Sequence, residues 1–367
     1  MANRFGPWLR NRFPELDPVL LAALGVLSLV GLATLYSAAS DHPGRFGEQL
    51  RNYGLAAVVM MALAGLSPRM LKRLALPVYV IGLVLLVAVL VVGVQVKGAQ
   101  RWLDLGVMRI QPAEIMKLGV PLMLAWYFDR REGVARRADF AVAALLVLLP
   151  VALIVRQPDL GTALLVLAAG FFVIFFAGLP WIWLAAMAGA APALLAAAWL
   201  LMHDYQRNRI LTLVDPMSDP LGKGFHTLQA MIAIGSGGAF GKGWMQGTQT
   251  HLEFIPERTS DFIFAVYSEE FGLVGNLVLL ILFLVLVARA LAIAHQAATP
   301  FTRLLAGAIA MILFTFAFVN MAMVSGILPV VGVPLPFLSY GGTALVTLGM
   351  ACGMLMSVAR NRKLVQM

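Results

Sequence analysis

Long runs of apolar residues dominate this chain and limit what it can fold into. A helix needs about 20 apolar residues to cross the hydrocarbon core of a bilayer, and ten runs of roughly that kind occur in the sequence. They are Val19–Ala39, Leu50–Leu66, Leu76–Val94, Pro112–Phe128, Phe140–Val155, Leu160–Leu179, Trp181–Met202, Phe262–Ala288, Leu304–Leu328 and Leu338–Ala359. We therefore expect an all-α polytopic membrane protein with about ten transmembrane helices.

The composition agrees with this fold class. Of the 367 residues, 61% are hydrophobic and only 12% are charged, whereas soluble domains carry about 25% charged residues. A net charge of +9 would suggest nucleic-acid binding in a soluble chain, but in an apolar chain it reports membrane orientation. We expect no nucleic-acid partner. The single cysteine, Cys352, lies in an apolar run and is interpreted as a packing residue.

The positions of the basic residues predict the orientation. If the N-terminus is cytoplasmic, fifteen of the 27 Lys and Arg residues fall in cytoplasmic segments close to span ends. These are Arg4, Arg10, Arg12, Arg69, Lys72, Arg73, Arg130, Arg131, Arg136, Arg137, Arg289, Arg303, Arg360, Arg362 and Lys363. Cytoplasmic loops are enriched in basic residues, so both termini are predicted to be cytoplasmic. The first span follows a polar start without a cleavage site, so we expect it to be retained.

One connection is much longer than the others. Residues 203–261 separate the seventh and eighth spans and would lie on the extracytoplasmic face. Loops of this length are usually functional or disordered, and the aromatic residues here favour a partly ordered cap. We expect one membrane domain over residues 1–367 that contains this large extracytoplasmic loop, without a separate soluble domain.

Ionisable residues near the span ends are candidate functional residues, because burying a charge in a bilayer costs about 2.5–3.5 kcal/mol near a helix centre. Glu114 and Lys117 are three residues apart and share one helix face. They are either functional or an internal salt bridge that lets the helix pack. Arg101, upstream, neighbours a tryptophan suited to the membrane interface.

Two further acidic positions follow the same logic. Asp159 occupies a tight Pro- and Gly-bounded turn, where it is a candidate site residue or simply the N-cap of the next helix. Asp261 stands at the outer mouth of the eighth span, where N-capping is again the simpler interpretation. Glu269 and Glu270 lie about two turns deeper, and we expect one of them to pair with a buried base.

Some motifs indicate structure rather than chemistry. The glycine-rich segment 235–243 does not satisfy the nucleotide P-loop pattern, because Gly243 stands where Ser or Thr is required. His203, His226 and His251 lack metal-ligand spacing. The prolines and glycines of Ile327–Gly342 predict a non-helical segment that lines a cavity beside the last span, because irregular backbone at that depth must be buried in protein or line a cavity.

Several blocks, taken in order, resemble the SEDS family of shape, elongation, division and sporulation proteins. The blocks are Gly98–Leu103, Gln111–Glu114, Arg156–Thr162, Asn208–Ile210, Gly224–His226, Gly241–Gly243, Gly247–Thr250, Phe254–Tyr267 and Leu338–Gly342. Within the family, Gly326–Pro336 resembles the elongation (RodA-type) branch, since division-type (FtsW) members usually read Thr-Lys-Gly after the Leu-Pro pair. The resemblance extends from about the first span to the last.

The resemblance implies a peptidoglycan glycosyltransferase with ten spans that polymerises lipid II outside the cytoplasmic membrane during cell elongation. It also implies a class B penicillin-binding protein as the crosslinking partner, other membrane proteins of the elongation complex, and a divalent cation, Mg²⁺ or Mn²⁺. In this family the key acid would be Asp261, and Glu114 and Lys117 also matter.

The chemistry is consistent with these assignments. A sugar 4-hydroxyl attacks an anomeric carbon, and a carboxylate can take its proton. The leaving diphosphate needs cations placed in advance, for which Arg101, Lys117, Arg209 and Arg258 are candidates. Asp159, Ser260 and Ser339 complete the predicted substrate-binding set. Because a helix dipole that stabilises ionised Asp261 also weakens it as a base, a metal-ligand role for Asp261 stays open.

Two other functions compete with this one. A lipid II flippase would also use many spans, intramembrane charges and a Pro/Gly break, although the polar residues here gather at the outer mouth. A scaffold that only positions the penicillin-binding protein is the third alternative.

Overall fold

Long helices build a bundle in the computed structural model, which describes residues 16–96, 99–104, 106, 109–131, 136–201, 207, 211, 213, 223–252, 254, 255 and 257–362. Each of the ten predicted apolar runs lies on one of them. They are α2 (Pro18–Ala38), α3 (Pro43–Gly65), α4 (Pro68–Val92), α5 (Pro112–Asp129), α6 (Arg137–Arg156), α7 (Leu160–Phe176), α8 (Trp181–Leu201), α12 (Ile263–His295), α13 (Pro300–Val324) and α14 (Gly342–Arg362). The helical fold class is confirmed.

Six of these helices are long and apolar enough to cross a membrane: α2, α4, α6, α12, α13 and α14. Among the described residues, α7 and the first part of α8 are shorter apolar helices. The count of ten crossings therefore stays a prediction.

Proline marks the start of several helices. Pro18, Pro43, Pro68, Pro112 and Pro300 each stand in the first turn, where the missing N–H is not needed and φ is already helical. Because these prolines precede the apolar runs, α3 begins at Pro43 rather than at Leu50 and α4 at Pro68 rather than at Leu76. The apolar pattern identified the buried length of each helix but not its polar first turns.

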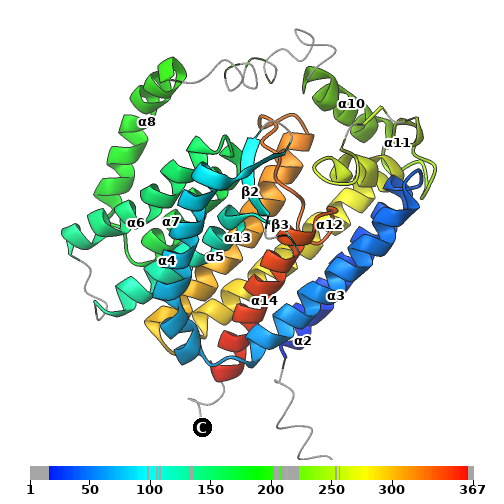
Figure 1. Cartoon of the computed structure of the whole chain (residues 1–367). Coiled ribbons are helices and arrows are strands. Elements are labelled where there is room, and N and C mark those ends of the chain that lie inside the picture. Colours follow the sequence, from blue (N-terminus) through cyan, green and yellow to red (C-terminus); the bar gives the residue numbers. More distant parts are fainter. Residues whose placement is uncertain are drawn as a thin grey trace, which may run out of the picture.

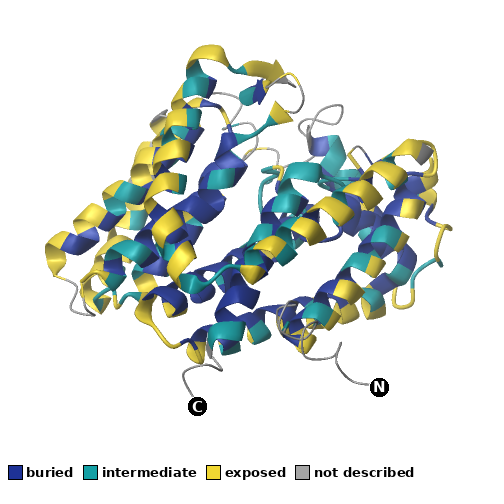
Figure 2. Cartoon of the chain, turned by 60° about the horizontal axis from the view of Figure 1, so that its bottom comes forward, coloured by how far each residue is buried: buried dark blue, intermediate teal, exposed yellow. Residues whose placement is uncertain are grey.

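The centre of the bundle is α13, which packs against α5, α7, α12 and α14 (Figure 1). The helix α3 pairs with α14, and α2 pairs with α12. Buried residues face this centre, whereas the outward faces carry exposed apolar side chains, as on α4 (Figure 2). An apolar exterior is the arrangement expected of helices surrounded by lipid.

A small antiparallel sheet joins α4 to α5, and the sequence analysis did not anticipate it. Its strands are β1 (Val94–Val96), β2 (Ala99–Asp104) and β3 (Arg109–Ile110), in that spatial order. Trp102 pairs with Val94, and Leu103 pairs with Ile110. The sheet places Arg101 at the end of the bundle where α5 begins and α6 ends.

The described part of the long loop contains α10 (Lys223–Ser236) and α11 (Thr248–His251), which lie against α12 (Figure 1). The glycine-rich segment 235–243 follows α10. A Cβ at Gly241, where φ is +81°, would stand 2.1 Å from the carbonyl oxygen of Glu270. The glycines therefore let the loop approach α12 closely, which agrees with setting aside a phosphate-binding role.

Candidate active site

A polar cavity of about 310 Å³ lies where five segments meet. Strand β2, the start of α7, helix α10, the turn before α12 and the segment between α13 and α14 each contribute to its wall. The lining residues are Arg101, Asp159, Leu160, His226, Glu257, Asp261, Phe262, Val330, Val331 and Gly332. The structure thus brings together three of the predicted site residues: Arg101, Asp159 and Asp261.

The turn before α12 presents Asp261 to the cavity. Glu257 has a φ of +50°, and its carbonyl accepts hydrogen bonds from the backbone N–H groups of Ser260 (3.0 Å) and Phe262 (3.3 Å). The N-cap of α12 is Phe262 rather than Asp261, so the capping interpretation of Asp261 does not hold. A left-handed backbone at a non-glycine residue is a strained conformation of the kind found at functional sites.

The opposite wall is the non-helical segment that the sequence predicted between the last two spans. Gly332 has a φ of +73°, and a Cβ there would lie 3.3 Å from Oδ2 of Asp261. The backbone conformation favours glycine, and a Cβ at this position would press against the carboxylate. The predicted cavity wall beside the last span is confirmed by Val330, Val331 and Gly332.

Asp159 has both of the roles considered for it. Its Oδ1 accepts a hydrogen bond from the backbone N–H of Thr162 (3.2 Å), which makes it the N-cap of α7. Its Oδ2 accepts from the Gln111 side chain (2.8 Å), and Nη1 of Arg101 lies 3.8 Å from Oδ1. The cap thus fixes a buried carboxylate inside the cavity wall.

Backbone carbonyls orient Arg101. Its Nε donates to the carbonyl of Gln157 at 3.3 Å, and its Nη2 donates to the carbonyl of Pro158. The side chain is held at the mouth of the turn that carries Asp159. A fixed guanidinium beside carboxylates is well placed to receive a phosphate.

Ser260 and Ser339 act as a clamp between two walls of the cavity. Ser339 Oγ donates to the carbonyl of Ser260 (2.7 Å) and accepts from the backbone N–H of Leu335 (2.7 Å). The Ser260 hydroxyl donates to Oε2 of Glu257 at 3.1 Å. Neither serine is among the cavity-lining residues. The arrangement therefore favours a structural role for the two serines over the predicted contact with substrate.

Asn320 on α13 supports the same region from inside the bundle. Its side-chain N–H₂ donates to the carbonyls of Asp261 (2.9 Å) and Val333 (2.7 Å). Asn320 is fully buried, and burying an amide in an apolar bundle is costly unless it is hydrogen-bonded. The sequence analysis missed this residue because an isolated Asn in an apolar helix does not reveal its partner.

Glu114 and Lys117 form a buried ion pair on α5. The Lys117 ammonium lies 2.5 Å from Oε1 of Glu114 and 4.8 Å from the ring centroid of Phe316. Oε2 of Glu114 has no hydrogen-bond partner among the described residues. The pair does not line the polar cavity. Phe316, which Lys117 contacts, lies one helical turn before Asn320 on α13.

Arg258 is committed to other contacts. Its Nε donates to the carbonyl of Ala38 (2.9 Å), its Nη1 to the carbonyl of Thr250 (2.6 Å), and its Nη2 pairs with Asp41 (2.5 Å). Burial of the Asp41 carboxyl acts to raise its pKa, but the hydrogen bond and charge of Arg258 outweigh burial and hold that pKa below its ordinary value. Arg258 ties the long loop to the end of α2 and does not line the cavity. Arg209 lies outside the described residues.

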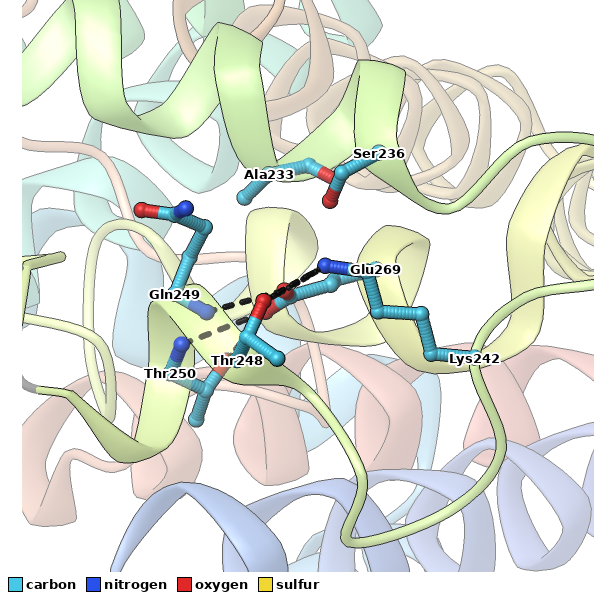
Figure 3. A network of polar contacts seen from close by, with 7 residues as sticks. All are labelled: Ala233, Ser236, Lys242, Thr248, Gln249, Thr250 and Glu269. Atoms are coloured by element: carbon cyan, nitrogen blue, oxygen red, sulfur yellow. Dashed lines mark hydrogen bonds and ion pairs between the residues drawn. The ribbon is translucent and has the colours of Figure 1, made fainter.

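Glu269 is the centre of a polar network that anchors the long loop (Figure 3). Its carboxylate pairs with Lys242 (2.7 Å) and accepts from the backbone N–H groups of Gln249 (2.9 Å) and Thr250 (3.2 Å). The hydroxyls of Thr248 (3.2 Å) and Thr250 (3.0 Å) also donate to it. One deep acid does pair with a base, as expected, but the base, Lys242, is half-buried rather than buried. The carbonyl of Thr250 also accepts a hydrogen bond from Arg258. The network therefore connects to the turn that carries Asp261.

A metal ion in the cavity would need ligands beyond the described residues. Among the described residues, no group of three or more His, Cys, Asp or Glu side chains could hold one. Mg²⁺ is commonly bound by one or two carboxylates together with substrate phosphates. The cavity carboxylates of Asp159, Glu257 and Asp261 fit only that shared arrangement.

The fold and the cavity define an integral membrane protein whose polar site lies at one end of a helical bundle. Within this class, the chain belongs to the FtsW/RodA/SpoVE family: the family described as "Cell cycle protein" matches residues 16–364. Membership confirms the predicted resemblance, and the protein is an integral inner-membrane protein.

Similar proteins agree along almost the whole chain. It is 47% identical to peptidoglycan glycosyltransferase MrdB of Escherichia coli K12, over 96% of this chain and 95% of the relative. It is 34% identical to the probable peptidoglycan glycosyltransferase FtsW of Trichlorobacter lovleyi, over 96% of this chain and 95% of that one.

Two solved structures share the fold. One, described as "Structural coordination of polymerization and crosslinking by a peptidoglycan synthase complex", has a TM-score of 0.83 and 36% identity and covers 95% of this chain and 98% of that chain. The other, rod shape determining protein RodA of Thermus thermophilus, has a TM-score of 0.72 and 34% identity, with the same coverage of 95% and 98%.

Proposed function

We propose that this protein is a RodA-type peptidoglycan glycosyltransferase that polymerises lipid II into glycan strands during cell elongation. The observation that carries the proposal is the polar cavity, in which Asp261, Asp159 and Arg101 meet at one end of a membrane-spanning bundle. Its relatives MrdB and FtsW are named as peptidoglycan glycosyltransferases. A carboxylate and a cation in one cavity are the groups that this transfer requires.

In the proposed reaction, Asp261 accepts the proton of the acceptor sugar 4-hydroxyl as its oxygen bonds to the anomeric carbon of the donor. The bond from that carbon to undecaprenyl diphosphate breaks, and the diphosphate leaves with the electron pair. Arg101, already oriented by two backbone carbonyls, stabilises the negative charge that develops on the leaving group. Asn320 holds the backbone of Asp261 in position, and Gly332 leaves room for its carboxylate.

A divalent cation is part of the proposal only as a group shared with the substrate. When bound, it would neutralise diphosphate charge, with Asp261 or Asp159 as the protein ligand. Lys117 and Glu114 are proposed to act indirectly, through the packing of α13 under Asp261, since they do not line the cavity.

We place the cavity on the extracytoplasmic face and both termini in the cytoplasm. Support comes from the fifteen basic residues that this orientation puts in cytoplasmic segments. The cavity lies at the opposite end of α6 from Arg137, one of those basic residues. The proposed partner is a class B penicillin-binding protein, because the structurally similar complex couples polymerization with crosslinking.

The deciding experiment is polymerisation of lipid II by purified protein, with and without the partner and with and without a chelator. Asp261→Asn keeps the shape of the side chain but removes the base, and we expect the rate to fall about 10²- to 10⁴-fold with unchanged thermal unfolding. Polymer formation by the variant at the wild-type rate would refute the assignment of the base. Movement of labelled lipid II across protein-containing vesicles without any polymer would instead favour a flippase.

A further inference from the structure

A second cavity lies at the opposite end of the bundle from Asp261. This lipid cleft has a volume of about 340 Å³ between α6, α7 and α8. Its walls are Arg137, Phe140, Ala141, Ala144, Val147 and Leu148 on α6, Leu167, Phe171 and Ile174 on α7, and Leu179, Trp183 and Met187 at and near the start of α8. Nothing in the proposed polymerase chemistry uses it.

The depth of the lipid cleft matches one leaflet of a membrane. Its lining on α6 extends from Arg137 to Leu148, which at 1.5 Å per residue is about 16 Å. Half of a hydrocarbon core of about 30 Å is about 15 Å. The cleft can therefore hold an acyl chain along its length but does not reach the other leaflet.

A single cation stands at the mouth of the cleft. Arg137 is the only charged residue in the lining, and it makes no hydrogen bond or ion pair with any residue in the described ranges. Its neighbours are engaged: Arg131 pairs with Asp139 at 3.1 Å, and Arg130 stacks on Trp126 at 4.4 Å. An apolar slot that ends in an unpaired guanidinium is complementary to a lipid with an anionic headgroup.

The third wall of the cleft, α8, is largely exposed. The helix α8 stands at the edge of the bundle (Figure 1), and most of its described side chains are exposed, including Trp183 and Met187. Lipid that occupies the cleft would contact α8 as well as α6 and α7, and would join this helix to the rest of the protein.

We propose that the cleft between α6, α7 and α8 binds an anionic phospholipid, with one acyl chain along α6 and the phosphate on Arg137. With the orientation proposed above, this lipid belongs to the cytoplasmic leaflet. Lipid binding itself does not depend on that orientation or on the polymerase activity, so the two proposals fail separately.

The test measures lipids retained by the purified protein, by native mass spectrometry after reconstitution with equal amounts of phosphatidylglycerol and phosphatidylcholine. We expect wild-type protein to retain more phosphatidylglycerol than phosphatidylcholine. In Arg137→Gln, the ratio of retained phosphatidylglycerol to phosphatidylcholine should fall about fivefold, because a basic residue near an anionic lipid contributes about 1 kcal/mol. Arg73→Gln is the matched control, because Arg73 is an exposed basic residue on α4 that the sequence places on the same membrane side.

A steric variant tests the acyl chain. Ala144→Trp fills the cleft and should abolish the retained lipid, and Ala141→Phe narrows it nearer to Arg137 if the first variant does not fold. Elution as a single species and unchanged thermal unfolding establish folding. Wild-type retention by a folded cleft-filling variant would overturn the proposal, as would equal losses in Arg137→Gln and Arg73→Gln, which would indicate attraction to the surface in general.

Discussion

At the scale of single residues, Asp159 shows how a capping residue can also be a site residue. Its Oδ1 caps α7, and the same carboxylate faces Arg101 and Gln111 in the cavity. Capping needs only an oxygen acceptor, which Asn supplies as well as Asp. The negative charge of Asp159 is therefore needed only if it contributes to the chemistry in the cavity.

Two substitutions separate these roles. Asp159→Asn should leave thermal unfolding unchanged but lower the rate of lipid II polymerisation about 10- to 100-fold, because it removes a charge that lies beside Arg101 in the cavity. Asp159→Ala should lose activity and also about 0.5–2 kcal/mol of stability, the cost of a lost N-cap. An active Asp159→Asn variant would reduce this residue to a cap.

The buried pair of Glu114 and Lys117 poses a similar question, which a double variant answers. Lys117→Met leaves an unpaired buried carboxylate and should destabilise the protein by about 3–5 kcal/mol. Adding Glu114→Gln removes that charge and should restore most of the stability. If the pair contributes to catalysis, the double variant unfolds near the wild-type temperature but polymerises poorly. Recovery of both the stability and the polymerisation rate would show that the pair contributes only to helix packing.

The candidate site could be predicted only partly from the sequence, for a physical reason. Asp159 and Asp261 were found because a carboxylate at the end of an apolar helix is costly and therefore conspicuous. Arg258 was equally conspicuous, but its partners Ala38 and Asp41 lie in a distant segment. A charge in a sequence indicates that a partner exists and does not identify it.

At the scale of elements, the network around Glu269 fixes a long loop to the helix that follows it. Five hydrogen-bond donors converge on one fully buried carboxylate. The network adds to the backbone hydrogen bonds that already join the loop between α10 and α11 to α12, such as those from Lys242 and Gly243 to the carbonyls of Glu269 and Glu270.

Breaking the pair should release the loop. Glu269→Gln leaves Lys242 without its counter-ion, and we expect a loss of about 3 kcal/mol and a lower polymerisation rate. Lys242→Met with Glu269→Gln should cost less than the sum of the two single variants, by at least about 0.5 kcal/mol, because the residues are coupled. Ser236→Ala is the control: its hydroxyl bonds only within α10. Strict additivity in thermal unfolding would show that the pair does not anchor the loop.

Element prediction succeeded where the pattern was long. Runs of apolar residues identified the ten long helices of the described residues, because a long apolar run is a strong pattern in the sequence. The strands β1–β3 have only three, six and two residues, too few for an alternating pattern to emerge. Their position nevertheless matters, since β2 carries Arg101 into the cavity.

At the scale of the whole molecule, the proposed orientation can be tested with cysteine labelling. The chain has one cysteine, and Cys352 is fully buried, so the wild-type protein should not react with a membrane-impermeant maleimide. Phe240→Cys, at a position 84% exposed on the long loop, should react in intact spheroplasts. Arg73→Cys should react only in inverted vesicles. The reverse pattern would contradict an extracytoplasmic cavity.

The closing wall of the polar cavity has a consequence for synthesis of the protein. Val330–Gly332 complete a pocket whose first contributor is Arg101, so more than half of the polypeptide must emerge from the ribosome between them. A nascent chain inserted into the membrane consequently lacks this wall until the segment between α13 and α14 is translated. A premature stop before Val330 yields a protein whose pocket is open on the side that faces Asp261.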